Sequence, residues 1–308
     1  MSYIFEALQR AEAERSGGSL PKPPDSVADL LQGVEQEIER RQVLSELPAT
    51  TESGLRAPDS FASAKTLFPS PAADARLVCL TDQGGLPAEK FRVLGLKLRH
   101  LRERRRLKRI VVTGTAPEEG KSLVAANLAL NQSRSKVLKT LLLDGDLRRP
   151  SLAARFGFDG SLPGLSECLR GERQLFEVVY KLNGSGLWFL PAGRAPENPL
   201  ELMQAGRVPE LLERLGEFFD WVIIDTPPVL PVADTAFWMK QADGVLVVIR
   251  EGVSERNVVE RALESFDRNN LLGVVVNSCS RDEHKYYYAR YHQVADQTGE
   301  EPLSADNE

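Results

Sequence analysis

The sequence predicts an α/β domain over about residues 76–280, with a mostly parallel sheet and helices on both of its faces. Two observations support this. Short apolar, β-branched runs recur without polar alternation, as expected of strands buried on both faces. These runs alternate with segments of helical periodicity, which is typical of right-handed βαβ units. In chain order the expected strands are RIVVTG, TLLLD, LWFLP, WVIID, GVLVVIR and LLGVVVN.

Composition limits the class of protein. The 308 residues are 42% hydrophobic, which is enough for a substantial core, and the net charge of −5 argues against a general nucleic-acid binder. Cys79, Cys168 and Cys279 are far apart and form no CxxC pair, a pattern that suggests reduced thiols in a cytoplasmic protein. With no signal peptide and no apolar run near 18 residues, we expect no membrane span.

Three segments flank the expected domain. Residues 1–16 have apolar positions at helical spacing and predict a short amphipathic helix that needs a partner surface, or else a frayed terminus. Residues 17–75 hold seven of the 19 prolines and are expected to be a mostly disordered linker, with a helix between about 27 and 47 as an alternative in its middle. Residues 281–308 are expected to form a flexible, tyrosine-rich tail.

The segment VVTGTAPEEGKS, residues 111–122, has the form of a phosphate-binding loop. An apolar strand enters a turn of small residues, and Gly120, Lys121 and Ser122 then open a helix. Backbone N–H groups at the helix start can bind phosphate, the lysine can bridge phosphate oxygens, and the serine hydroxyl can ligate Mg²⁺. The segment departs from a strict Walker A at Thr115, where glycine is usual.

Two aspartate motifs follow in the chain. Asp144 and Asp146 in TLLLDGDLRRP come just after a strand, and Asp225 in WVIIDTPP ends another. The carboxyl ends of parallel strands share one edge of a sheet, where ligands bind. The DxD pair alone is equally compatible with a solvated loop. Together with the phosphate-binding loop, the three carboxylates predict a metal–nucleotide site and a P-loop NTPase-like fold.

These motifs together resemble the bacterial tyrosine kinases of capsule and exopolysaccharide synthesis, over about residues 80–292. GTAPEEGKS, DGDLRR and DTPP are similar to the family's Walker A, DxDxR and DxxP motifs. AEKFRVLGLKLR is similar to its ExxRxxR helix, and PAGRAPENPLELM is similar to a loop and helix that follow its next strand. The resemblance implies an ATP- and Mg²⁺-dependent protein-tyrosine autokinase.

The resemblance also implies roles for individual residues. Lys121 would bind the β- and γ-phosphates, Asp146 would orient or deprotonate the tyrosine hydroxyl, and Arg148 would contact phosphate or set the site's geometry. The expected Mg²⁺ ligands or supports are Ser122, Asp144 and Asp225. The expected nucleotide contacts are Thr115, Glu119, Gly120, Lys121, Ser122, Leu123 and Asn277, although Asn277 could instead cap a strand end.

The segment KYYYARYH, residues 285–292, is the expected substrate. In the family such a cluster is phosphorylated in trans, and the neighbouring charged residues argue against an apolar pocket for these rings. The expected autophosphorylation sites are Tyr286, Tyr287, Tyr288 and Tyr291.

The expected partners also follow from the resemblance. They are a membrane-anchored chain-length regulator that activates the kinase at the inner face of the plasma membrane, other copies of the chain, and a cognate tyrosine phosphatase. In the family the ExxRxxR helix contacts a neighbour in a ring, and the resemblance implies that role for Glu89 and Arg92. The third position here is Gly95, which weakens the case for the same ring unless Arg99 substitutes.

Some features leave alternatives open. The run KLRHLRERRRLKR, residues 97–109, is either a solvated helix end or a contact for an acidic partner or anionic lipid. A ParA/MinD-like ATPase switch shares the fold, but it usually has a lysine at the position of Ala116. A catalytically silent nucleotide-binding subunit would have the same pocket in sequence.

Overall fold

A computed structural model describes Phe61 and residues 64–158, 162–205, 207–230, 232–267 and 269–278. Within these residues no helix is both long and apolar enough to cross a membrane. The expected N-terminal helix and the tyrosine-rich tail lie outside the described residues.

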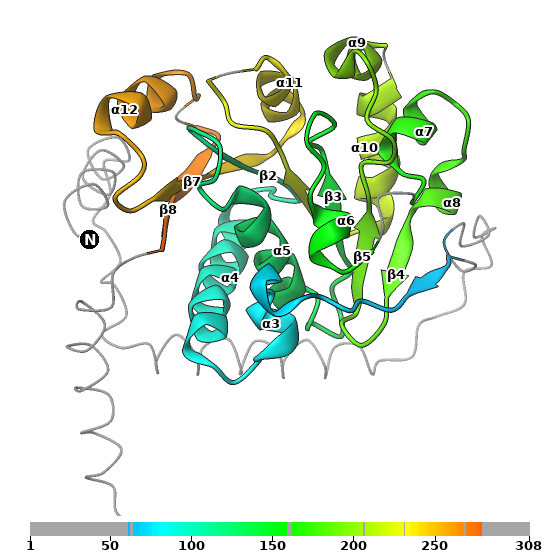
Figure 1. Cartoon of the computed structure of the whole chain (residues 1–308), viewed down its shortest axis with the longest axis horizontal. Coiled ribbons are helices and arrows are strands. Elements are labelled where there is room, and N and C mark those ends of the chain that lie inside the picture. Colours follow the sequence, from blue (N-terminus) through cyan, green and yellow to red (C-terminus); the bar gives the residue numbers. More distant parts are fainter. Residues whose placement is uncertain are drawn as a thin grey trace, which may run out of the picture. The chain divides into compact units, whose positions relative to one another are not determined.

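The centre of the fold is an eight-stranded sheet in the order β1-β4-β5-β3-β6-β2-β7-β8 (Figure 1). All neighbouring pairs are parallel except β4 and β5, which are antiparallel. The strands are β1 Thr66–Leu67, β2 Arg109–Gly114, β3 Thr140–Asp144, β4 Tyr180–Leu182, β5 Leu187–Leu190, β6 Trp221–Asp225, β7 Gly244–Arg250 and β8 Leu271–Asn277. The predicted mostly parallel α/β fold is therefore confirmed.

Helices cover both faces of this sheet and bury two separate apolar clusters, because alternate residues of a strand point to opposite faces. On β3, Leu141 and Leu143 belong to one cluster and Leu142 to the other. The face of Leu142 is covered by η1 Ala73–Ala75, α3 Val78–Thr81, α4 Leu86–Arg104, α5 Lys121–Gln132 and α6 Leu152–Arg155. The opposite face packs against α7 Leu165–Leu169, α8 Leu175–Val178, α9 Pro199–Gln204, α10 Arg207–Phe218, α11 Asp234–Gln241 and α12 Arg256–Glu264.

The sheet includes residues that precede Arg76. Thr66 and Leu67 pair with Lys181 and Leu182 of β4, and Phe61 is buried in the core. Part of the segment expected to be linker is thus packed on the domain. The strand is only two residues long, so its sequence carries no periodic signal by which it could be recognised.

The carboxyl ends of β2, β3 and β6 lie side by side. Val112 of β2 is in register with Asp225 of β6, and Asp225 is in register with Asp144 of β3. The fold therefore brings the phosphate-binding loop and both aspartate motifs to one edge of the sheet.

Candidate functional site

The loop between β2 and α5 is held in shape by a buried glutamate. Glu119 is fully buried, and its Oε2 accepts hydrogen bonds from the N–H groups of Thr115 (2.6 Å) and Ala116 (3.0 Å). Its Oε1 accepts hydrogen bonds from the hydroxyls of Thr115 (2.5 Å) and Ser254 (2.6 Å). Glu119 thus ties the start of the loop to its end and to the segment after β7. A side chain at position 114 would collide with this carboxylate, so the glycine there is needed.

Two further residues hold the outer side of the loop. Asn277, the last residue of β8, donates from Nδ2 to the carbonyl of Glu119 at 2.9 Å. Arg250, the last residue of β7, donates to the carbonyl of Glu118 at 3.4 Å. Glu118 has a φ of 64° and Gly120 a φ of 91°, both in the left-handed region that favours glycine. These contacts stabilise the left-handed backbone conformation at Glu118, which a glutamate does not favour by itself.

Lys121 and Ser122 form the first turn of α5. Lys121 is 8% exposed, and its Nζ donates to the carbonyl of Ala116 at 2.8 Å. Burial lowers the pKa of Lys121, while the charges of Glu119, Asp225 and Asp146 oppose that shift. The ammonium is therefore influenced by three carboxylate charges at the helix start, where anion binding is also favoured by the free N–H groups of the first turn.

Asp144 and Asp225 form a pair of buried carboxylates at the ends of β3 and β6. Oδ2 of Asp144 accepts the N–H of Leu152 at 3.1 Å. Its Oδ1 and both carboxylate oxygens of Asp225 accept no hydrogen bond from the described residues. Burial raises the pKa of Asp225 to about 7, an effect that the nearby Ser122 hydroxyl and Lys121 partly offset. Burial, followed by the charge of Asp225, raises the pKa of Asp144 well above its ordinary value.

The glycine between Asp144 and Asp146 fixes their relative position. The N–H of Gly145 donates to the carbonyl of Asp225 at 2.8 Å, and its own carbonyl accepts from Nε1 of Trp238 at 3.1 Å. A Cβ at Gly145 would lie 2.8 Å from the Asp225 carbonyl oxygen. Only glycine fits this close approach.

Asp146 is half-buried and lies two residues after Asp144 of the buried carboxylate pair. Its Oδ1 accepts the N–H groups of Arg148 (3.2 Å) and Arg149 (2.9 Å), and its Oδ2 has no partner among the described residues. The Arg148 guanidinium binds Asp234 in a bidentate pair, with Nε–Oδ2 at 2.6 Å and Nη2–Oδ1 at 2.9 Å. Asp234, at the start of α11, is only 1% exposed, so Arg148 is tied to α11.

This oxygen-rich edge fits a magnesium ion. Mg²⁺ is usually held by one or two carboxylates together with phosphate oxygens and water. The unpartnered oxygens of Asp144 and Asp225 beside the Ser122 hydroxyl match that requirement. The part of the chain that the structure describes contains no cluster of three or more His, Cys, Asp or Glu side chains arranged as a self-sufficient metal site.

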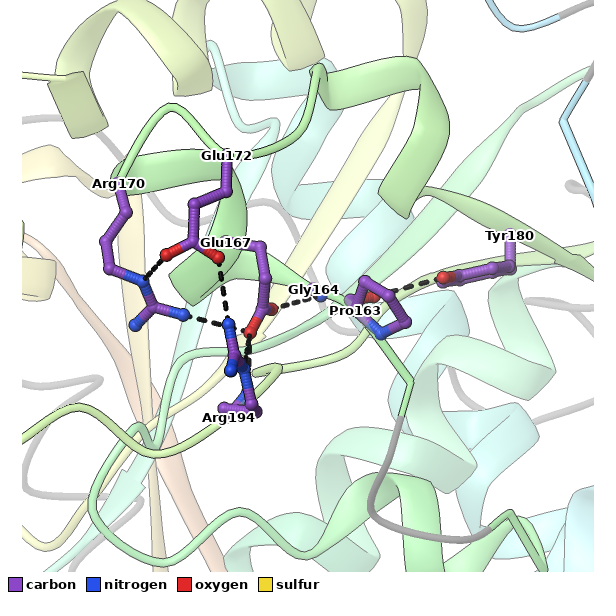
Figure 2. A network of polar contacts seen from close by, with 7 residues as sticks. All are labelled: Pro163, Gly164, Glu167, Arg170, Glu172, Tyr180 and Arg194. Atoms are coloured by element: carbon purple, nitrogen blue, oxygen red, sulfur yellow. Dashed lines mark hydrogen bonds and ion pairs between the residues drawn. The ribbon is translucent and has the colours of Figure 1, made fainter.

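A network of charged residues in and just after α7 holds the loop that follows β5 (Figure 2). Buried Glu167 accepts the N–H of Gly164 (2.7 Å) and both the N–H and Nε of Arg194 (3.2 and 3.1 Å). Arg170 and Glu172 complete the network through ion pairs. The hydrogen bonds to Glu167 lower its pKa although burial alone would raise it. The segment resembling the family's post-strand loop is therefore fixed beside β3.

The ExxRxxR-like segment lies on α4. Glu89 and Arg92 form an ion pair with each other and are part-exposed. Gly95 is buried against α5, where a Cβ would lie 2.3 Å from Oδ1 of Asn131. Arg99 donates from Nε to Gln132 Oε1 at 2.9 Å, and burial lowers its pKa. Position 95 is thus a close helix–helix contact, and Arg99 is engaged within the fold.

Much of the basic run 97–109 serves the fold itself. Arg102 pairs with Asp220 at 3.3 Å and lies over the Trp221 ring, and Arg109 pairs with Asp243 at 2.9 Å. Arg105 and Lys108 donate to backbone carbonyls of Asn269 and Gly216. The structure therefore assigns several of these cations an internal role that neither interpretation of the sequence anticipated.

The structure brings together most of the predicted site residues. Thr115, Glu119, Gly120, Lys121, Ser122 and Asn277 meet at the loop, and Asp144, Asp146 and Asp225 lie beside them. Leu123 is part-buried in the first turn of α5, and Arg148 faces Asp234. Sequence reasoning missed Asp234, Ser254, Arg250 and Glu167. Each contacts a partner distant in the chain, and no local motif marks it.

A cavity of about 470 Å³ lies away from these residues, at the opposite ends of the strands. It is bordered by Ser133 and Arg134 after α5, Lys139 before β3 and Gly186 before β5. None of the predicted nucleotide or metal residues lines it, so cavity size alone does not locate this site.

No family model matches the chain. Curated proteins do. The chain is 33% identical over 179 residues to tyrosine-protein kinase CpsD of Streptococcus agalactiae, covering 58% of this chain and 77% of that protein. It is 32% identical over 213 residues to tyrosine-protein kinase YwqD of Bacillus subtilis, covering 68% and 89%.

Solved structures give the same picture. The kinase domain of Escherichia coli tyrosine kinase ETK matches with a TM-score of 0.62 at 27% identity, over 74% of this chain and 97% of that one. The septum site-determining protein MinD of Pyrococcus horikoshii matches with a TM-score of 0.50 at 22% identity, over 57% and 72%. The likeness to MinD shows the common P-loop fold alone, and the more similar proteins are tyrosine kinases.

Proposed function

The chain belongs to the family of bacterial tyrosine kinases, and we propose that it uses ATP and Mg²⁺ to phosphorylate the C-terminal tyrosines of other copies of itself. The observation that carries this proposal is the arrangement at one sheet edge. Two buried carboxylates with unpartnered oxygens lie beside the P-loop lysine, and a third, Asp146, keeps one oxygen free at the surface.

The donor side of the reaction belongs to the P-loop. N–H groups at the start of α5 bind the phosphates, and Lys121 moves from the Ala116 carbonyl to the β- and γ-phosphate oxygens. Asn277 holds the loop through the Glu119 carbonyl, a position from which it also borders the nucleotide. The expected contacts of Thr115 and Glu119 are indirect in this proposal, since both side chains are engaged in shaping the loop.

Mg²⁺, when bound, neutralises charge on the transferring phosphoryl group. Ser122, Asp144 and Asp225 would hold it. A bound metal would also supply the positive charge that the paired carboxylates lack.

The acceptor side belongs to Asp146. The tyrosine oxygen attacks the γ-phosphorus, the bond from that phosphorus to the bridging oxygen breaks, and ADP leaves. Asp146 accepts the phenolic proton through its free Oδ2. A phenol of pKa about 10 is a poor nucleophile at neutral pH, so a carboxylate at this position assists the attack. Arg148 acts on geometry: its pair with Asp234 fixes the turn whose N–H groups hold Asp146.

The tail can reach such a site. Described structure ends at Ser278, and Tyr286 lies eight residues further along the chain, or at most about 29 Å when fully extended. The chain's own Asp146 lies four strands away from β8 in the sheet, which is roughly 19 Å at the usual strand spacing. Length therefore permits transfer within one chain as well as between copies, and the experiment must separate the two.

Phosphorylation of this tail provides a release mechanism. Each phosphate adds roughly −1.5 to −2 charge. Several on Tyr286, Tyr287, Tyr288 and Tyr291 would be repelled by the carboxylates of a neighbour's site. We therefore infer that phosphorylated tails leave that site, which loosens the oligomer.

The proposal extends to partners through the family resemblance. The kinase would regulate exopolysaccharide or capsule polymerisation or export, and a membrane-anchored chain-length regulator would activate it at the inner face of the plasma membrane. A cognate tyrosine phosphatase would reset the tail. Glu89 and Arg92 remain the proposed contacts between copies, and buried Gly95 argues that any ring differs in detail from one built on a full ExxRxxR motif.

The test mixes two variants in the presence of radiolabelled ATP. One chain carries Lys121→Met and an intact tail, and the other has phenylalanine at all four tail tyrosines with an intact site. Transfer between copies labels the Lys121→Met chain, at a rate that rises with concentration. Label on wild type but not in the mixture would refute transfer in trans, and release of phosphate without labelled tyrosine in wild type would refute the autokinase.

A further inference from the structure

A groove that includes Arg148, two residues beyond Asp146, has no role in the reaction described so far. It has a volume of about 320 Å³ and is lined by Arg148, Asn198, Pro199, Leu200, Glu201 and Gln204. Pockets for small ligands usually span roughly 300–1000 Å³, so this groove suits a side chain and its neighbours better than a nucleotide. We call it the α9 groove.

The position of the α9 groove follows from the strand order. β6 and β2 carry Asp225 and the P-loop on one side of β3, and β5 lies on the other side. α9 begins after the loop that leaves β5, and Arg148 belongs to the loop that leaves β3. The loop that carries Asp146 and Arg148 therefore leaves the sheet between the strand that carries Asp225 and the strand that leads to α9. The α9 groove thus lies on the side of this loop that faces away from the P-loop strand.

The chemistry of the α9 groove suits an aromatic residue. Pro199 is buried and Leu200 packs partly against the core, which gives an apolar floor. The Arg148 guanidinium is held in place by Asp234 and is still 41% exposed. A fixed planar guanidinium is a surface on which an aromatic ring can stack.

The α9 groove also has a charge that no described residue pairs with. Glu201 is exposed, and among the described residues it forms no ion pair or side-chain hydrogen bond. The charge of Arg148, by contrast, is offset by Asp234. A basic group bound in the groove would meet Glu201.

The tail supplies such groups. In KYYYARYH, every tyrosine lies within two residues of Lys285 or Arg290. We propose that the α9 groove binds the acceptor tail, with a tyrosine ring against Arg148, its hydroxyl at Asp146, and a flanking Lys or Arg paired with Glu201. This proposal rests on the tail-phosphorylating function and names the residues that would select basic tyrosine-containing segments.

The test uses the full chain with its four tail tyrosines changed to phenylalanine, so that only added peptide is phosphorylated. The peptide KYYYARYH and its charge-reversed form EYYYAEYH are compared for binding, by fluorescence anisotropy, and for phosphorylation. Glu201→Lys should weaken binding of KYYYARYH and raise its KM by about 5- to 20-fold, and should improve EYYYAEYH relative to wild type. Glu197→Lys makes the same charge change at an exposed residue of the loop just before α9 that does not line the groove, and should do neither.

The outcomes separate the two proposals. Equal binding of KYYYARYH by wild type and Glu201→Lys, or equal effects of the two lysine variants, would overturn the groove assignment while leaving tail phosphorylation intact. Phosphorylation of no tyrosine in either peptide, and of none in the tail of the wild-type chain assayed in parallel, would instead overturn the proposed function. Because anisotropy needs no turnover, the groove is tested even where the kinase requires its activator.

Discussion

Neutralising Asp225 should stabilise the protein in the absence of nucleotide. Its carboxylate is 1% exposed, neither oxygen has a hydrogen-bond partner in the described part of the chain, and Asp144 lies directly opposite in register. Burial raises its pKa from 3.8 to about 7. A shift of that size corresponds to a folding penalty on the order of 4 kcal/mol at pH 8. An asparagine in the same place loses about 1–3 kcal/mol through its own unsatisfied amide.

We therefore expect Asp225→Asn to be more stable than wild type by roughly 1–3 kcal/mol at pH 8, seen as a Tm about 5 °C higher. The sign with pH follows from the raised pKa. The folding free-energy penalty of ionised Asp225 is absent below the unfolded pKa, grows between the unfolded and the folded pKa, and is complete above about pH 7. The advantage of the variant should accordingly shrink by about 2–3 kcal/mol at pH 5.

The assay is thermal or denaturant unfolding at pH 5 and pH 8, without nucleotide and then with ATP plus Mg²⁺ or ATP plus EDTA. Wild type should gain stability from ATP chiefly when Mg²⁺ is present, and Asp225→Asn should lose most of that gain. Asp74→Asn, at an exposed aspartate of η1, is the control and should change neither result. An Asp225→Asn protein no more stable than wild type at pH 8, or equal ATP effects with Mg²⁺ and EDTA, would contradict the account of the carboxylate pair.

Three further predictions concern the surroundings of the site. Glu167→Gln should lower the free energy of unfolding by about 3 kcal/mol at pH 7, because it leaves buried donors unpaired. Since the pKa of Glu167 is lowered in the folded protein, this loss should diminish as the pH falls through that pKa. A pH-independent loss in urea unfolding would contradict this. Asn277→Ala should weaken ATP binding about fivefold through the freed Glu119 carbonyl, and unchanged affinity in a nucleotide titration would remove that contact from the site. Gly95→Arg should lower stability by about 1–3 kcal/mol, since α4 and α5 touch at Asn131; a stable variant that forms larger oligomers by size-exclusion chromatography would show that this helix face is free.

Much of the fold could be predicted from the sequence because its central strands are buried on both faces. RIVVTG, TLLLD, WVIID and GVLVVIR coincide with the central strands β2, β3, β6 and β7, and LLGVVVN coincides with β8, a part-buried edge strand. Each is a largely apolar run bounded by turn residues, which is the signal such strands give. The opposite edge of the sheet, at β1 and β4, behaves differently. β1 has two residues and β4 three, so neither shows a period, and the antiparallel pairing of β4 depends on contacts that only the folded sheet provides.

The site divides in a similar way. The P-loop and the aspartates were predictable because their chemistry is encoded at fixed spacing along the chain. The residues that hold them are not. Asp234 lies 86 residues from Arg148, and Ser254 lies 135 residues from Glu119. An aspartate at the start of a helix and a serine in a loop are common surface residues, so their sequence context gives no indication of these partners.

The different burial of the three aspartates matches the different work proposed for them. Asp144 and Asp225 are almost fully buried, where an unpaired charge is costly, so they favour the ionised state only when a cation accompanies the nucleotide. Asp146 lies two residues beyond the end of β3, is half-buried, and keeps one oxygen of its carboxylate free of partners among the described residues. A group that must meet a phenol arriving from solvent cannot be enclosed in the same way. Asp144 and Asp225 lie at the ends of β3 and β6, and the α9 groove lies on the other side of β3. In the proposed reaction, one sheet edge can therefore enclose the phosphates while Asp146 stays open to a tyrosine-containing peptide.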